Sequence, residues 1–137
     1  MSNQVYLHTG KKEHVFIEVP LVIKPYDIDA AGHVNNIVYV RWLEDMRNRL
    51  ISSVCDLDML LQSGLYLAVI STEINYRKQL KLFDRPKGYM EISRFEHGIF
   101  LLNSEITLHR DIIAAAEQKC VIMDLHNSKM ITGKYYK

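Results

Sequence analysis

The spacing of apolar residues changes once in the first third of this chain, at residue 37. Over residues 15–23 every second residue is apolar, which predicts a half-buried strand, and Pro25 ends it. Over residues 37–54 the apolar residues recur at three- and four-residue steps, which predicts a long amphipathic helix. Asn35 or Asn36 is the expected N-cap, because an asparagine side-chain oxygen accepts a hydrogen bond from a first-turn amide.

The remainder of the chain is predicted to be mostly extended. A short second helical piece is expected over residues 56–63, and Gly64 stops it. One alternation is then expected to run along a strand from Tyr66 to Tyr76, with one face formed by the mostly apolar residues Tyr66, Ala68, Ile70, Thr72, Ile74 and Tyr76. The other expected segments are a turn region with Asp84, Pro86 and Gly88, a hairpin of residues 89–95 and 99–109 about 96–98, and a polar tail from Asn127 that frays or forms a short edge.

Residues 112–125 are the ambiguous segment. Ala114–Glu117 favours a helix by propensity, whereas Cys120–Met123 favours a strand. We expect a strand, because the preceding strand needs a neighbour. One strand, one long helix and then a run of antiparallel strands predict an α+β fold in which a sheet curves around a central helix. At 137 residues, one domain spanning 1–137 is expected.

Composition and charge exclude several classes of protein. Hydrophobic residues make up 48%, charged residues 24%, and the net charge is +1, so no strong field attracts nucleic acid or a membrane. The first 14 residues lack the apolar core of a signal peptide, and the longest apolar run, 65–70, is too short to span a bilayer. Cys55 and Cys120 are too few for a disulfide framework, so we expect reduced thiols in a cytoplasmic protein.

Polar groups with acid–base capacity gather in one stretch, Tyr26–Asn36. It places two acids, a glycine, a histidine and two asparagines between an apolar strand and the start of the predicted helix. A helix N-terminus has unpaired amides and a positive dipole end, so this position suits the binding and polarising of a carbonyl group. The string from Asp27 begins like a calcium loop, but Ala31 and Val38 stand where oxygen ligands are needed, and no zinc spacing is present. We therefore expect no metal and no other cofactor.

Together with the order of elements, the segment Asp27–Asn36 resembles the loop of the hotdog-fold thioesterases. It is most similar to the 4-hydroxybenzoyl-CoA thioesterase-like branch, which includes bacterial acyl-CoA thioesterases and is related to plant acyl-ACP thioesterases. The other matching residues are Tyr39, Trp42 and Glu44 on the helix and Ile74–Leu80 at the next strand. The resemblance covers roughly residues 15–126. It implies a hotdog fold, with five or six antiparallel strands wrapped around helix 37–54, and a homodimer or homotetramer with active sites between subunits.

The activity implied by the resemblance is hydrolysis of an acyl thioester. The catalytic acid of this branch falls on Asp29, and Asp27 then has a supporting role at the substrate site. The chemistry agrees, because an ionised Asp29 can deprotonate a water or attack the carbonyl directly, while His33 can donate to the carbonyl oxygen or orient the water. Glu44 is the reserve acid, and Tyr39 is expected to pack in the core or in a dimer contact.

The developing oxyanion needs hydrogen-bond donors. Amides near Asn35, Asn36 and Ile37 would lie at the helix start and can hold the carbonyl oxygen. Asn36 is expected to act both as a cap and as oxyanion support, and Gly32 is expected to let the backbone approach the substrate.

The carrier of the thioester is left open by the sequence. Some members of the family carry a basic run in the hairpin turn that meets the phosphates of CoA, but here the turn is Glu96–Gly98 with only Arg94 beside it. The alternative substrate-binding cations are Arg77, Lys78, Arg85 and Lys87. Three hypotheses follow: an acyl-CoA thioesterase, an acyl-ACP thioesterase, and a non-catalytic protein that binds acyl thioesters.

Overall fold

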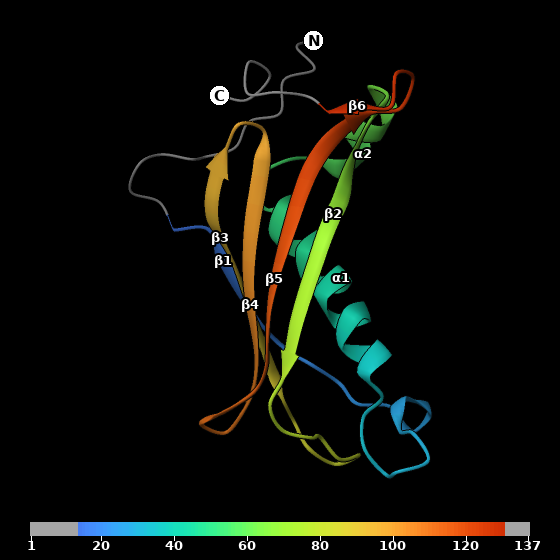
Figure 1. Cartoon of the computed structure of the whole chain (residues 1–137), viewed down its shortest axis with the longest axis vertical. Coiled ribbons are helices and arrows are strands. Elements are labelled where there is room, and N and C mark those ends of the chain that lie inside the picture. Colours follow the sequence, from blue (N-terminus) through green and yellow to red (C-terminus); the bar gives the residue numbers. More distant parts are fainter. Residues whose placement is uncertain (1–13, 131–137) are drawn as a thin grey trace.

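A curved antiparallel sheet packs against one long helix, α1, in the computed structural model, which describes residues 14–130 (Figure 1). The elements are β1 (Phe16–Pro20), a 3-10 turn η1 (Pro25–Asp27), α1 (Asn36–Ser52), α2 (Leu57–Gln62), β2 (Leu65–Tyr76), β3 (Lys87–Glu96), β4 (Ile99–Leu108), β5 (Asp111–Asp124) and β6 (Lys129–Met130). The strand order is β1-β3-β4-β5-β2, and β6 pairs with β5. The predicted hotdog architecture is confirmed, with β5 resolving the ambiguous segment as a strand.

The apolar stripe of α1 forms one side of the core. Its buried side chains face the concave side of the sheet and include Tyr39, Leu43, Met46 and Leu50. The helix starts after Asn35, whose side-chain Oδ1 accepts a 3.0 Å hydrogen bond from the amide of Ile37. Of the two caps that the sequence allows, the structure therefore has Asn35.

Strand β2 does not keep a single alternation, so that prediction was wrong for half of the strand. Its register against β5 shifts between Val69 and Ser71, which makes Ile70 a β-bulge. After the bulge, Ile74 packs against the core as predicted. Before it, Leu65 and Leu67 pack against the core, whereas the predicted parity had Tyr66 and Ala68. One extra residue in the strand thus exchanges its two faces.

Two boundaries near β3 also differ from the prediction. The strand expected to reach residue 23 ends at Pro20, because Pro20 is paired with Lys87, the first residue of β3. Gly88, expected in a turn, lies inside β3 and is buried. A Cβ atom at Gly88 would overlap the Met46 sulfur of α1, so glycine lets this strand approach the helix closely.

Within residues 14–130 the other predicted elements are confirmed, and the part of the predicted polar tail beyond Met130 lies outside the described residues. The short second helix is α2, capped by the Asp56 side chain, which accepts a hydrogen bond from the amide of Met59. The β3–β4 hairpin turns at His97 and Gly98, both with positive φ, the geometry of a tight two-residue turn. Within residues 14–130, no helix is long and apolar enough to cross a membrane.

Candidate active site

The polar stretch before α1 folds into a loop that is closed at its base. Ile28 and Val34 form an isolated antiparallel bridge. The amide of Asn35 donates to the carbonyl oxygen of Asp27 at 2.8 Å. The amide of Val34 donates to the carbonyl oxygen of Leu80 at 2.8 Å, which ties the loop to the β2–β3 connection. The loop therefore has a fixed position relative to the start of α1 and the end of β2.

Asp29 lies at the exposed tip of this loop and uses only one carboxylate oxygen to hold it. Its Oδ1 accepts hydrogen bonds from the amides of Ala31 (2.9 Å) and His33 (3.4 Å). Gly32 between them has φ +83°, a left-handed conformation that favours glycine, so its role here is in the turn. The Oδ2 atom of Asp29 accepts no hydrogen bond from any described residue. The turn thus orients the carboxylate and leaves one oxygen for chemistry.

Asp27 has a different environment, because it is buried. Its Oδ1 accepts from the Arg41 Nη2 of α1 at 3.0 Å, and its Oδ2 accepts from the amide of Lys24 at 2.9 Å. The carboxylate of Asp27 therefore joins η1 to the helix, and this residue is not among those that line the cleft described next.

A cleft of about 450 Å³ opens between the loop, the first turn of α1 and the end of β2. It is lined by Asp29, Ala31, His33, Val34, Asn35, Asn36, Tyr39, Tyr76, Arg77, Lys78 and Gln79. The cleft thus brings together six residues that the sequence predicts for the site, namely Asp29, His33, Asn35, Asn36, Arg77 and Lys78, whereas Arg85 and Lys87 are not among its lining. Gly32 and Asp27 support the loop from outside the lining. Arg94 lies near the β3–β4 turn, at the other end of the sheet, and Glu44 lies on the exposed side of α1.

The first turn of α1 offers one unused amide. The amide of Ile37 is occupied by the Asn35 side chain, and the amide of Val38 donates to the Asn35 carbonyl oxygen at 2.9 Å. The backbone N–H of Asn36 donates to no acceptor among residues 14–130. Because Asn36 lines the cleft, its amide is a hydrogen-bond donor at the positive end of the helix dipole.

Two tyrosines in the cleft were not predicted as site residues. Tyr39 and Tyr76 pack edge to face, with ring centroids 5.2 Å apart, and the Tyr76 hydroxyl donates to the Asn36 carbonyl oxygen at 3.2 Å. Burial, followed by the neighbouring Tyr76, raises the pKa of Tyr39 to about 12, and burial raises the pKa of Tyr76. Both hydroxyls are therefore protonated at neutral pH. The alternation that placed Tyr76 on the helix side of β2 was the one indication of this contact in the sequence.

The polar side chains around the cleft differ in how they are paired. Lys78 lies 3.1 Å from the Asp111 carboxylate, whereas Arg77 forms no ion pair with a described residue. The Nδ1 atom of His33 is buried and has no hydrogen-bond partner among the described residues. Arg77 is thus the cleft cation available to an anionic group, and His33 retains hydrogen-bonding capacity in the cleft.

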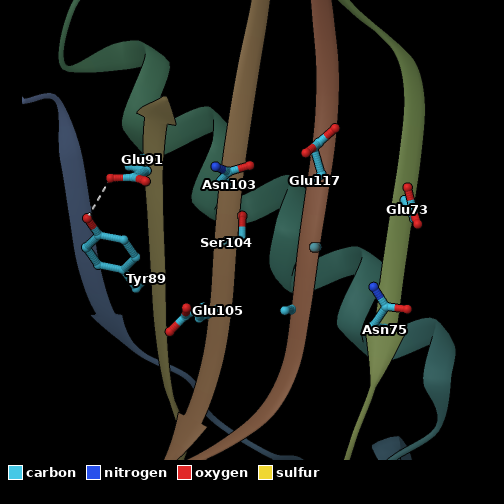
Figure 2. A pocket seen from close by; sticks show the side chains of 10 residues that line it. Glu73, Asn75, Tyr89, Glu91, Asn103, Ser104, Glu105 and Glu117 are labelled. Carbon is cyan, nitrogen blue, oxygen red and sulfur yellow. Dashed lines mark hydrogen bonds between the residues drawn. The ribbon is translucent and has the colours of Figure 1, made fainter. Parts of the chain in front are cut away.

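A second hollow, of about 350 Å³, lies on the other face of the sheet, with α1 behind it (Figure 2). Four glutamates on four strands line it, namely Glu73, Glu91, Glu105 and Glu117. Carboxylates repel the phosphates of an acyl carrier, and no basic side chain from residues 14–130 lines this hollow. Within the described part of the chain, no group of three or more His, Cys, Asp or Glu side chains is arranged to hold a metal ion.

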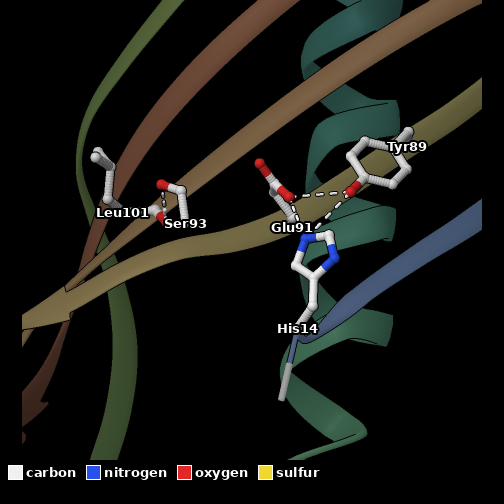
Figure 3. Close-up of polar contacts among 5 residues, drawn as sticks. All are labelled: His14, Tyr89, Glu91, Ser93 and Leu101. Atoms are coloured by element: carbon white, nitrogen blue, oxygen red, sulfur yellow. Dashed lines mark hydrogen bonds and ion pairs between the residues drawn. The ribbon is translucent and has the colours of Figure 1, made fainter. Parts of the chain in front are cut away.

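At one edge of this hollow, polar contacts fasten the start of β1 to β3 (Figure 3). The Tyr89 hydroxyl donates to the Glu91 Oε2 at 3.0 Å, and the His14 Nε2 contacts the same oxygen. Burial and then the hydrogen bond to Glu91 raise the pKa of Tyr89 to about 12. Next along β3, the Ser93 hydroxyl donates to the Leu101 carbonyl oxygen. These contacts hold the sheet together and lie on the opposite side from the cleft.

The sequence and the fold are similar to those of known proteins. A model of the thioesterase-like superfamily matches residues 23–132, and the chain belongs to that superfamily. It is 29% identical over 107 residues to the chloroplastic acyl-acyl carrier protein thioesterase ATL3 of Arabidopsis thaliana, a match that covers 72% of this chain and 56% of ATL3. It therefore matches only about half the length of that relative.

A bacterial relative is matched along nearly its whole length. The chain is 23% identical over 117 residues to the long-chain acyl-CoA thioesterase FadM of Escherichia coli K12, covering 84% of this chain and 89% of FadM. Among solved structures, a DHNA-CoA thioesterase from Staphylococcus aureus superposes with a TM-score of 0.79 at 15% identity, over 85% of this chain and 80% of that one. A 1,4-dihydroxy-2-naphthoyl-CoA thioesterase from Synechocystis gives 0.77 at 18% identity, over 85% and 88%. At these identities the structures establish the fold.

Proposed function

We propose that this protein hydrolyses an acyl thioester in the cleft, with Asp29 as its catalytic acid–base or nucleophilic group. The observation that carries the proposal is that one cleft at the start of α1 is lined both by Asp29, whose Oδ2 is not engaged by a described residue, and by Asn36, whose amide is likewise not engaged. A carboxylate and an oxyanion donor are the two groups that acyl transfer needs. Membership of the thioesterase-like superfamily supports the same reaction.

In the general-base form of the reaction, Asp29 takes a proton from a water whose oxygen attacks the carbonyl carbon. The carbonyl oxygen becomes an oxyanion, which accepts a hydrogen bond from the Asn36 amide at the positive end of α1. The C–S bond then breaks, the thiolate leaves, and the proton held by Asp29 neutralises it. In the nucleophilic form, Asp29 attacks the carbonyl carbon itself, the C–S bond breaks and the thiolate leaves. Water then hydrolyses the resulting anhydride, which releases the acid, returns the Asp29 carboxylate and supplies the proton that neutralises the thiolate. His33 orients the water or donates to the carbonyl oxygen in either form.

The test is thiol release from a panel of acyl-CoAs by the wild type and by Asp29→Asn. Asparagine keeps an Oδ1 acceptor for the Ala31 and His33 amides, so this variant removes the charge and preserves the turn. We expect thiol release to fall by about 100-fold or more, because general-base catalysis contributes on the order of 100- to 10,000-fold. Asp56→Asn, a capping aspartate outside the cleft, is the matched control and should retain wild-type turnover. Undiminished turnover by Asp29→Asn would refute the role of Asp29.

An acyl-ACP substrate is the second candidate. The β2–β3 connection carries four cations against one carboxylate, namely Arg77, Lys78, Lys81 and Arg85 against Asp84, and Lys87 follows at the start of β3. A basic surface beside the cleft complements either the phosphates of CoA or an acidic carrier protein. Turnover of acyl-ACP well above that of the matching acyl-CoA would favour the carrier protein. Saturable binding of both without thiol release would instead indicate a non-catalytic binding protein.

We also propose that the protein works as a homodimer or homotetramer. Strand β2 is an edge of the sheet over twelve residues, and its Ile70 is 53% exposed. A long unpaired edge with an exposed apolar side chain is a surface on which a second copy can pair. Sedimentation equilibrium tests this, and a monomer at micromolar concentration would contradict it.

A further inference from the structure

Tyr39 lies between the cleft and a second, narrower space. On one side it lines the cleft that holds Asp29. On the other side it lines a narrow gap between α1 and the sheet, about 170 Å³ in all and too tight for a water molecule. The other residues of this gap are Leu43, Ile74, Ser104, Ile106, Ala114 and Ala116.

The ring of Tyr39 is held firmly in this position. It is 2% exposed, and Tyr76 and Trp42 both pack against it edge to face, with centroids at 5.2 and 5.3 Å. Tyr76 is itself anchored by its hydrogen bond to the Asn36 carbonyl oxygen. The cleft is therefore closed on its inner side.

Three of the five sheet residues that line the gap have small side chains, namely Ser104, Ala114 and Ala116. Ala116 on β5 is paired with Ser104 on β4 and with Ile74 on β2, so these side chains share the face toward α1. Ser104, which is among the residues lining the gap, is 3% exposed, and its buried hydroxyl has no hydrogen-bond partner among the described residues. Removing the Tyr39 ring would join this space to the cleft and lengthen it inward.

The lining of the cleft itself is mostly polar. Apart from the two tyrosine rings, the only apolar residues that the described part of the chain contributes to this lining are Ala31 and Val34. An aliphatic chain gains free energy in proportion to the apolar surface it removes from water. Each methylene beyond the first few would therefore find little apolar surface in the cleft as it stands.

We infer that Tyr39 determines acyl-chain length and that this protein acts on thioesters of short acyl groups, which end against the Tyr39 and Tyr76 rings. The inference rests on the proposed function, since it assumes that the cleft binds the acyl group. Tyr39 is on this view a specificity-determining residue whose ring closes the inner side of the cleft.

The experiment compares acetyl-, butyryl-, octanoyl- and palmitoyl-CoA as substrates for the wild type, Tyr39→Phe and Tyr39→Ala. We expect the wild type and Tyr39→Phe to prefer the two short substrates, because both keep the ring. Tyr39→Ala should raise the ratio of kcat/KM for octanoyl-CoA to that for butyryl-CoA by at least tenfold. If Tyr39→Ala does not fold, Tyr39→Leu retains more of the packing and should shift the ratio in the same direction. Refilling the gap with Ala116→Leu in the Tyr39→Ala background should return the preference to short chains.

Wild-type turnover that is fastest on palmitoyl-CoA, or a chain-length profile unchanged in both Tyr39→Ala and Tyr39→Leu, would overturn the inference. Binding measurements separate a failure of the proposed hydrolysis from a failure of this inference. Calorimetry measures the affinity for S-alkyl-CoA thioethers of the same chain lengths, which bind without reacting. Even if no thioester is hydrolysed, the inference is supported when the affinity of the wild type stops rising after the butyl thioether while the affinity of Tyr39→Ala continues to rise with chain length. Equal slopes in the two proteins, or no binding by either, overturn it.

Discussion

The contact between Asp27 and Arg41 leads to a prediction that can be quantified. The Asp27 side chain is 5% exposed and the Arg41 side chain 55% exposed, with 3.0 Å between Oδ1 and Nη2. Arg41→Met removes the guanidinium while retaining an apolar stem of similar length. The buried carboxylate then keeps only the amide of Lys24 as a donor to its side chain.

The expected loss follows from the two environments. A hydrogen bond to a charged group contributes about 1.5–3 kcal/mol, and breaking a fully buried ion pair costs about 3–5 kcal/mol. Because more than half of the Arg41 side chain is exposed, solvent screens the pair and replaces part of the lost interaction. We therefore expect Arg41→Met to lower the free energy of unfolding by about 1–2 kcal/mol. The coupling energy in a cycle with Asp27→Asn should be about 1 kcal/mol.

The assay is urea unfolding of the wild type, both single variants and the double variant at one protein concentration, so that any association affects all four equally. Arg49→Met is the matched control, because Arg49 is an exposed arginine of α1 without an ion pair among the described residues. It should change stability by less than about 0.5 kcal/mol. A coupling energy below about 0.3 kcal/mol would show that Asp27 and Arg41 behave as an ordinary surface pair, and the reasoning would fail.

Three further results are expected. Asn35→Ala removes the cap of α1 and should cost about 1 kcal/mol in urea unfolding, and an unchanged midpoint would contradict the capping role. Gly88→Ala forces a methyl group against Met46 and should cost about 1–3 kcal/mol, so a stabilised variant would show that β3 can move away from α1. Burial raises the pKa of the Cys55 and Cys120 thiols to about 11 from 9.0, so thiol reagents should react slowly at pH 8 until urea is added. The pKa of both thiols is higher in the folded protein than in the unfolded chain. The contribution of the two thiols to the free energy of unfolding is therefore complete below pH 9 and is lost between pH 9 and 11. Stability that rises over this range would contradict it.

Local patterns predicted most of the fold because each depends on neighbouring residues. The helix period, the Asn35 cap and the turn at His97 and Gly98 are set within a few positions of the chain. The bulge at Ile70 is different, because it exists only in the pairing of β2 with β5, about fifty positions along the chain. No count along β2 alone shows where one residue drops out of the ladder.

The same distinction holds for the site. The acids and amides of the cleft could be predicted because they lie together in one stretch before a helix. The contact of Asp27 with Arg41 spans fourteen positions, and that of Tyr76 with Asn36 spans forty. These contacts depend on where the end of β2 meets the start of α1. Arg94 was selected from its place beside a turn, and the ten-residue length of β3 puts that turn at the other end of the sheet from the cleft.

The bulge at Ile70 divides β2 into two halves in which residues of opposite parity face the helix. In the half before it, odd-numbered residues face the helix, and in the half after it even-numbered residues do. The change occurs because Ile70 has no partner on β5, so the alternation shifts by one residue. A deletion of Ile70 would give β2 one continuous alternation. The two halves of the strand therefore accept substitutions by opposite rules. The half that ends in the cleft tolerates polar residues at odd positions, and the half nearest α2 tolerates them at even positions.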